Sequence, residues 1–190
     1  MASLPAPARR PELDPAVLDR ARRGDSGAFV ALVRQYDAGL RQLAFRLLGD
    51  RDRMDDALQE AYVHAFRGLP RFRGDSTLGT WLYRIVYNAC LGELGRARQV
   101  VALDSIRDRP DPSPGAHETF PVRSDLADAL ARLSPADRAA VLLVDAQGFD
   151  YRGAAEVLGV PEGTVASRLN RARALLRRAL DDTLEGACEQ

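Results

Sequence analysis

Residues 149–169 read FDYRGAAEVLGVPEGTVASRL, a stretch with the layout of two short helices joined by a tight turn. Ala154 and Ala155 supply small side chains where two helix backbones pass close together. Gly159 can adopt the positive φ of a tight turn without steric cost, and Pro161 suits the first turn of the helix that follows. The stretch therefore predicts a helix-turn-helix.

The second helix of this motif has one apolar face and one basic, polar face. The apolar face holds Val165, Leu169, Ala172 and Leu176 at helical spacing. Residues 163–180 contain five arginines and no acid, whereas a solvated surface helix usually mixes both signs. We therefore predict a helix that reads duplex DNA rather than an ordinary amphipathic surface helix. The groups on its polar face that can reach base edges or phosphates are Thr164, Ser167, Arg168, Asn170 and Arg171.

The bulk charge of the chain points the other way. Its 190 residues carry 27 basic and 27 acidic side chains, so the formal net charge is zero, and every basic residue is arginine. Zero net charge argues against a protein that coats nucleic acid in general. The charges are nevertheless unevenly distributed along the chain, because residues 181–190 hold four acids and no base.

Several functional classes find no support in the sequence. No apolar run reaches the roughly 18 residues that a membrane span needs, and the proline-rich start does not resemble a secretory signal. Two cysteines and two histidines lie too far apart for a disulfide framework or a zinc site, which favours the cytoplasm and predicts no metal or other cofactor. Adjacent Asp55 and Asp56 would point about 100° apart on a helix, so we expect no metal-dependent enzyme.

Helix-start and helix-stop signals predict an all-α protein of two small domains. Helices are expected at about 15–24, 26–48, 52–66 and 77–98, and again within residues 124–182. Four prolines between residues 110 and 121 interrupt the helical pattern. The predicted parts are a disordered lead (1–13), a first helical domain (14–98), a flexible linker (99–123), a helix-turn-helix domain (124–182) and an acidic tail (183–190).

An acidic and amide cluster marks the third predicted helix. Asp56, Gln59 and Glu60 stand at positions i, i+3 and i+4, so they share one face. Leu58, Tyr62 and Phe66 are expected on the opposite side, in the core. Such a cluster taken alone is typical of a solvated helix face.

The next segment, residues 71–88, interleaves aromatic side chains with arginines around a polar loop. That combination suits single-stranded nucleic acid, because arginines follow the phosphates while a pocket takes an unstacked base. Trp81 has helical spacing from Leu78 and Ile85 and is expected to be structural, and Cys90 to be a small buried hydrophobe. The candidate DNA-contacting residues are Arg73, Gly74, Asp75, Ser76, Thr77, Arg84 and Asn88.

Three motifs in this order resemble those of the extracytoplasmic-function sigma factors, a two-domain group of the sigma-70 family. The motifs are DALQEAY at 56–62, the segment from FRG at 72 to TWLYRI at 80–85, and GTVASRL at 163–169. The resemblance covers about residues 25–180, with a proline-rich linker between the second and third motifs.

The resemblance implies a dissociable initiation subunit of bacterial RNA polymerase. Asp56, Gln59 and Glu60 would dock on the clamp helices of the largest polymerase subunit. The 72–85 segment would melt the promoter and capture a flipped base of the −10 element. In the second domain, Ser167, Asn170 and Arg171 would read the −35 duplex while Arg168 and Arg173 hold phosphates. A cognate anti-sigma factor is an expected partner.

One position departs from the family, and one alternative function remains. Ala166 stands where the family commonly has lysine or arginine, so the −35 sequence preference cannot be carried over from relatives. The alternative is a stand-alone helix-turn-helix transcriptional regulator. The two functions differ in the first domain, because such a regulator has no use for the Asp56, Gln59 and Glu60 face or for a melting loop.

Overall fold

The computed structural model describes residues 14–105 and 125–188, and within these ranges it contains helices and no strand. The first half of the chain forms five α-helices and one 3₁₀ turn: α1 (Pro15–Arg22), α2 (Ser26–Arg34), α3 (Asp37–Leu48), α4 (Arg51–Gly68), η1 (Leu69–Arg71) and α5 (Leu78–Ser105). The second half forms four α-helices and one π-helical turn: α6 (Asp125–Ala131), α7 (Pro135–Val141), η2 (Leu142–Ala146), α8 (Tyr151–Leu158) and α9 (Glu162–Cys188).

Side-chain caps explain where many of these helices begin. Each capping side chain accepts a hydrogen bond from a backbone N–H two or three residues ahead, which satisfies a donor that has no partner inside the helix. The distances lie between 2.8 and 3.2 Å. The capping residues are Asp14, Asp25, Asp50, Ser134 and Asp150.

The helix predicted over residues 26–48 is broken in the structure, so that prediction was wrong. α2 ends at Arg34 and α3 starts at Asp37, with Tyr36 between them. The break lets the ring of Tyr36 pack on α5 at Gly79, where it occupies the space that a side-chain carbon would need. Packing between α3 and α5 therefore overrides a continuous apolar pattern.

Two helices also run further than the sequence suggested. α5 continues to Ser105, past the expected boundary at residue 98, and α9 continues to Cys188 through most of the predicted acidic tail. Residues 99–105 contain neither glycine nor proline, so nothing stops the helix there. The predicted lead and the rest of the predicted linker lie outside the described residues.

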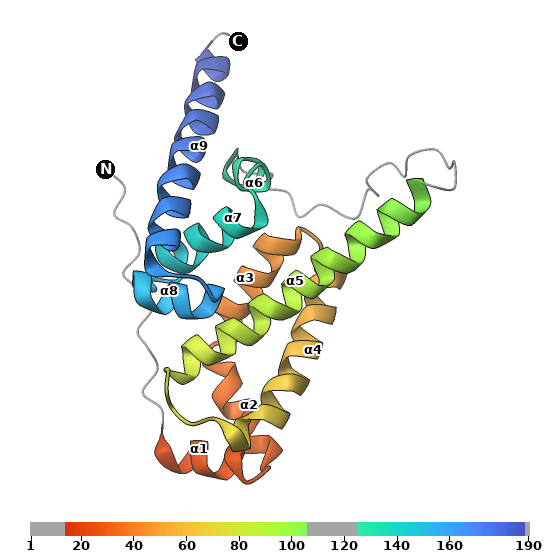
Figure 1. Ribbon diagram of the computed structural model, residues 1–190, viewed down its shortest axis with the longest axis vertical. Coiled ribbons are helices and arrows are strands. Elements are labelled where there is room, and N and C mark those ends of the chain that lie inside the picture. The colour runs from red at the N-terminus through yellow and green to blue at the C-terminus, as the bar shows by residue number, and fades with distance from the viewer. Residues whose placement is uncertain (1–13, 106–124, 189–190) are drawn as a thin grey trace.

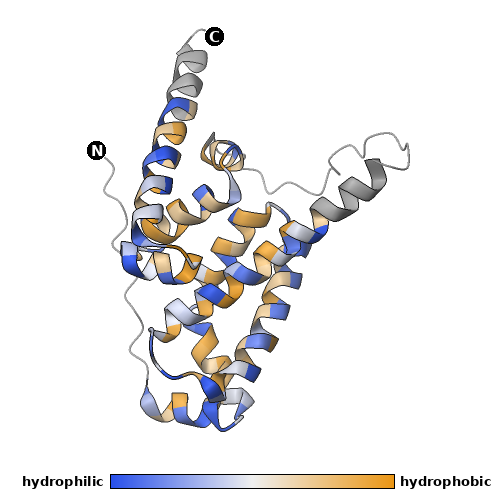
Figure 2. Cartoon of the chain, in the orientation of Figure 1, coloured by the Kyte–Doolittle hydropathy of each residue, from blue (hydrophilic) through white to orange (hydrophobic). Residues whose placement is uncertain are grey.

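The two halves pack against each other around one hydrophobic core (Figure 1). α3, α4 and α5 form the centre of the first half, and α6, α7 and α8 pack against α9 in the second. α8 lies against α5 and α7 touches α3, so residues far apart in sequence share the core. Figure 2 shows hydrophobic turns of α3, α5 and α8 coming together in the middle of the molecule. The core is therefore continuous across the boundary between the two predicted domains.

Candidate functional site

The acidic and amide cluster lies on an outer face of α4. Asp56 and Gln59 are exposed, and Glu60 is half-buried. The carboxylate of Glu60 accepts from Nη2 of Arg96 on α5 at 3.0 Å, so part of its charge is already paired. Asp56 has no ion-pair partner among the described residues. The structure therefore brings the three predicted residues together and leaves Asp56 with the most available charge.

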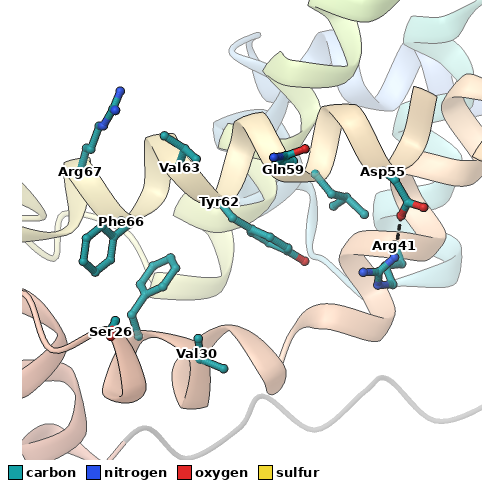
Figure 3. Close-up of a pocket in the computed structure, with 11 residues that line it drawn as sticks. Ser26, Val30, Arg41, Asp55, Gln59, Tyr62, Val63, Phe66 and Arg67 are labelled. Carbon is teal, nitrogen blue, oxygen red and sulfur yellow. Dashed lines mark hydrogen bonds and ion pairs between the residues drawn. The ribbon is translucent and has the colours of Figure 1, made fainter. Parts of the chain in front are cut away.

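Beside this cluster, α2 and α4 enclose an apolar groove of about 700 Å³ (Figure 3). Phe29 and Val30 from α2 and Tyr62, Val63 and Phe66 from α4 contribute most of its apolar lining. Val30 and Val63 remain 47% and 42% exposed, which is high for residues of this type. The groove is an uncovered apolar surface next to an acidic one, an arrangement that marks protein-binding sites.

The prediction of which residues of α4 lie in the core was wrong for two aromatic residues. Tyr62 and Phe66 were expected in the core opposite Gln59, but both are half-buried and line the groove together with Gln59. Residues seven apart on a helix differ by only about 20° in direction, so Phe66 must lie close to the face of Gln59. Leu58 is buried, as expected. The phenol of Tyr62 donates to Asp37 at 2.7 Å, and burial together with this carboxylate raises its pKa.

An ion pair contributes to the lining of the groove. Nη1 of Arg41 on α3 donates to Oδ1 of Asp55 on α4 at 2.9 Å, and a second bond joins Arg41 to Asp37 within α3. The hydrogen bond to Asp55 is the main reason why the pKa of Arg41 is raised. Both side chains are about half exposed, so the pair orients the groove wall more than it stabilises the fold.

The polar loop before α5 presents some of its predicted residues and uses others to build the helix start. Arg73, Gly74 and Asp75 are exposed, and Gly74 has a φ of 81°, in the left-handed region that favours glycine. Thr77 Oγ1 accepts from the backbone N–H of Thr80 at 3.1 Å, so its side chain caps α5. Ser76 is half-buried, and its hydroxyl donates to the carbonyl of Thr77 at 3.4 Å.

Aromatic packing holds the loop against α5. The rings of Phe72 and Trp81 lie 5.2 Å apart, and Trp81 packs against the core, which confirms that its role is structural. Arg22 of α1 donates to the carbonyl of Phe72 at 2.8 Å. Cys90 is fully buried, and burial raises the pKa of its thiol to about 12, which confirms the expectation of a small buried hydrophobe.

Further along α5, Arg84 and Asn88 are exposed and lie one helical turn apart on the same face. The neighbouring face carries Tyr83 and Tyr87, which are only 6% and 5% exposed. Sequence reasoning missed these two tyrosines. Their four-residue spacing was visible, but the contacts that bury Tyr83 come from residues distant in sequence, Gly39, Gln147 and Phe149.

The second helix of the helix-turn-helix, α9, presents its two faces as predicted. Val165, Leu169 and Ala172 are completely buried. α8 ends at Gly159, whose φ of 65° makes the tight turn, and α8 packs against α9. Of the six predicted residues on the other side, three are exposed and three are half-buried. The exposed residues are Ser167, Asn170 and Arg171, and the half-buried ones are Thr164, Arg168 and Arg173.

Two of the arginines on α9 are held by carboxylates of the same half. Arg173 makes a two-pronged contact with Asp145 of η2, from Nε at 3.0 Å and from Nη2 at 2.5 Å. These hydrogen bonds raise the pKa of Arg173. Arg171 Nε lies 3.5 Å from Asp137 of α7. The acids are 28 and 34 residues away from their partners in sequence, so no local signal revealed them.

Two segments of the chain match models of the sigma-70 family. Residues 32–100 match sigma-70 region 2, and residues 123–176 match sigma-70 region 4. The chain is also 43% identical over 159 residues to the ECF RNA polymerase sigma factor SigM of Mycobacterium tuberculosis, covering 83% of this chain and 79% of that protein. The chain belongs to the ECF sigma factors. The stand-alone regulator is thereby set aside, and the protein is an RNA polymerase sigma factor for promoter recognition and transcription initiation.

Solved structures of sigma factors share the fold. CnrH in complex with the cytosolic domain of CnrY matches with a TM-score of 0.66 and 27% identity, covering 88% of this sigma factor and 96% of that chain. The sigma factor RpoE in complex with the anti-sigma factor NepR, from Bartonella quintana, matches with a TM-score of 0.63 and 28% identity, covering 80% and 97%. The all-helical prediction with a region 2 and a region 4 is confirmed.

The described part of this sigma factor lacks both a membrane-spanning helix and a cluster of metal-binding side chains. Within residues 14–105 and 125–188, no helix combines the length and the apolar character needed to cross a bilayer. In the same residues, His, Cys, Asp and Glu side chains do not gather in threes where they could hold a metal ion.

Proposed function

We propose that the first domain docks on core RNA polymerase through Asp56, Gln59 and Glu60, with the clamp helices of the largest subunit as the partner. The cluster is acidic, exposed and placed beside the apolar groove between α2 and α4. An interface of this kind combines apolar burial in the groove with charge complementarity at its edge. A basic, apolar helical partner fits both parts.

The −10 element of the promoter is proposed to run from the loop along α5. Arg73 and Arg84 reach phosphates, Asn88 meets the adjoining duplex, and Gly74, Asp75 and Ser76 form the rim that takes an unstacked base. Thr77 contributes by capping α5, which fixes the loop relative to the helix. The exposed positions of Arg73, Arg84 and Asn88 support this assignment.

The −35 element is proposed to be read by α9, and one observation carries this assignment. Ser167, Asn170 and Arg171 are exposed on a helix whose other face, Val165 and Leu169 included, is completely buried. Helix N-termini of helix-turn-helix proteins enter the major groove, where such groups contact base edges. Arg168 and Arg173 hold the phosphates on either side, with Thr164 at the helix start, and Asp145 orients the guanidinium of Arg173.

A protein regulator and a cellular setting complete the proposal. A related structure contains a sigma factor with an anti-sigma factor, which supports a cognate anti-sigma factor as a partner of this chain. We propose that the chain acts in the cytoplasm, where polymerase transcribes. We also propose that it catalyses no reaction and binds no cofactor.

Transcription in vitro tests the proposed function directly. Core polymerase and this chain together should produce transcripts from a subset of promoters in a genomic template library. Core polymerase alone should produce none of them. Failure to obtain any transcript, together with tight promoter binding by the chain without polymerase, would contradict the proposal.

A further inference from the structure

The loop that carries the proposed base-taking rim is fixed at both of its ends. Phe72 begins the loop, and its N–H donates to the carbonyl of Leu69 at 3.0 Å. The carbonyl of Phe72 accepts from Nη2 of Arg22 at 2.8 Å, and its ring lies 5.2 Å from that of Trp81. At the other end, the side chain of Thr77 caps α5. Both backbone polar groups and the side chain of Phe72 are therefore held by the surrounding structure.

Between these two ends the rim itself is open. Arg73, Gly74 and Asp75 are exposed. A side-chain carbon added at Gly74 would meet no atom within 4 Å. A segment with so few contacts of its own takes its position from the groups that hold its ends. The anchors of Phe72 and Thr77 therefore decide where the rim lies.

The anchor of the Phe72 carbonyl comes from α1, a helix that has no role so far. Arg22 is the last residue of α1 and lies 50 residues before Phe72 in sequence. α1 packs chiefly against α2 and η1, and Figure 1 shows the loop before α5 reaching α1. The whole of α1 precedes residues 32–100, the segment that matches sigma-70 region 2. The family match therefore assigns no function to this helix.

The corner between α1 and α2 makes the end of α1 a firm base for Arg22. Nε and Nη2 of Arg20 donate to Oδ2 of Asp25 at 2.9 and 2.6 Å. Oδ1 of the same carboxylate accepts from the N–H of Ala28 at 3.0 Å and so caps α2. Gly24 makes the turn with a φ of 92°, in the region that favours glycine. One carboxylate thus holds the end of α1 to the start of α2.

We propose that α1 is part of the −10-reading apparatus and that Arg22 is a positioning residue, which holds the Phe72 carbonyl so that the rim at 73–76 is in place before an unstacked base arrives. This inference rests on the proposed function of the loop. A loop that is already ordered loses less conformational entropy when the base binds, so more of the contact energy is available to distinguish one base from another. Arg22 acts through Phe72 and not through a contact of its own with DNA.

The fluorescence of Trp81 tests the anchor in the free, full-length chain. Trp81 is the one tryptophan in the sequence, and its ring contacts that of Phe72. Arg22→Met removes the hydrogen-bond donor and keeps most of the side-chain length. Arg23→Met, at the neighbouring exposed arginine, removes the same charge and is the matched control. Acrylamide should quench Trp81 about twofold more strongly in Arg22→Met, because the Phe72 end of the loop is released, and equally in the control and the wild-type chain.

Base selection by the holoenzyme tests the consequence for DNA. Core polymerase with each variant is incubated with a pool of short single-stranded DNA oligonucleotides of random sequence, and the bound fraction is sequenced. The wild-type holoenzyme should select one base strongly at one position. Arg22→Met should weaken this selection roughly fivefold, the effect of one lost hydrogen bond on the order of the loop. The total amount of DNA bound and the assembly with core polymerase should change little, because the proposed phosphate and docking residues are intact.

The proposal requires both changes. Where the wild-type holoenzyme selects a base, unchanged quenching or unchanged selection with Arg22→Met overturns the role of Arg22, even if transcription succeeds. An equal loss of selection with Arg23→Met would make the lost charge, and not the lost position, the cause and would also overturn it. If the wild-type holoenzyme selects no base while Arg22→Met raises the quenching, the proposed −10 reading is at fault and Arg22 remains the anchor of the loop.

Discussion

α4 presents carboxylates and α9 presents guanidinium groups, and in both helices some of these charges are already paired inside the molecule. On α4, Asp55 is bound by Arg41 and Glu60 by Arg96. On α9, Arg173 is bound by Asp145, and Arg171, which is otherwise exposed, lies 3.5 Å from Asp137. The two helices therefore suit partners of opposite charge. In both, a nearby residue of opposite charge orients a long side chain.

The two helices differ in which groups the internal pairs leave available. On α4 the predicted docking residues that make no ion pair within the described residues are Asp56 and the neutral Gln59. On α9 the exposed groups include the neutral Asn170 as well as arginine. A neutral amide, like a charged guanidinium group, can form hydrogen bonds with base edges. The number of charged residues on a helix therefore overstates the charge that a partner meets.

A core substitution under the α9 surface should have the largest effect. Leu169 is fully buried, so Leu169→Ala should lower the free energy of unfolding by about 3 kcal/mol through lost burial and a cavity. Urea denaturation followed by circular dichroism measures the change. Leu175→Ala, at an exposed position on the same helix, is the control. A change below about 1 kcal/mol for Leu169→Ala would mean that α9 is not packed as described.

Removing one exposed arginine should separate DNA reading from polymerase docking. Arg171→Ala should weaken binding to a −35 duplex by roughly tenfold or more, the usual cost of losing a side chain that contacts base edges. Holoenzyme formation should be unchanged, because Arg171 lies on α9 and the docking face on α4. Fluorescence anisotropy with DNA and a pull-down with core polymerase measure the two effects, and Arg177→Ala is the matched control. An equal loss in both assays would contradict this division between the helices.

On α4, the unpaired acid should matter more than the paired one. Asp56→Arg should weaken docking on core polymerase roughly tenfold by placing a like charge against a basic partner. Glu60→Arg should also weaken docking, although Arg96 already shares the charge of Glu60. His64→Ala, at another exposed position of α4, is the control. Unchanged holoenzyme formation with both arginine variants would remove this face from the polymerase interface.

The smallest effect concerns salt. If Arg168 contacts a phosphate, Arg168→Ala should reduce the slope of log binding constant against log salt concentration by about 1, for any duplex sequence. Asn170→Ala should change sequence preference without changing that slope. The same slope for Arg168→Ala and the wild-type chain would mean that Arg168 contacts no phosphate.

Local signals predicted much of this molecule because their causes are local. Capping residues such as Asp25 and Ser134 satisfy donors within three residues, and the faces of α9 follow from helical spacing alone. The same signals did not predict features whose cause lies far away in the sequence. The break at Tyr36 depends on Gly79, the burial of Tyr83 depends on Phe149, and the counter-charge of Arg173 lies 28 residues away. Such contacts leave no periodic mark in the sequence.

The continuous core has a thermodynamic consequence. Family models divide the chain into two regions, yet α5 of the first and α8 of the second cover each other's apolar faces. Unfolding either half would expose the aromatic pair of Tyr83 and Phe149 to water. The free chain should therefore melt as one cooperative unit, with a single calorimetric peak, although its sequence matches two separate family regions.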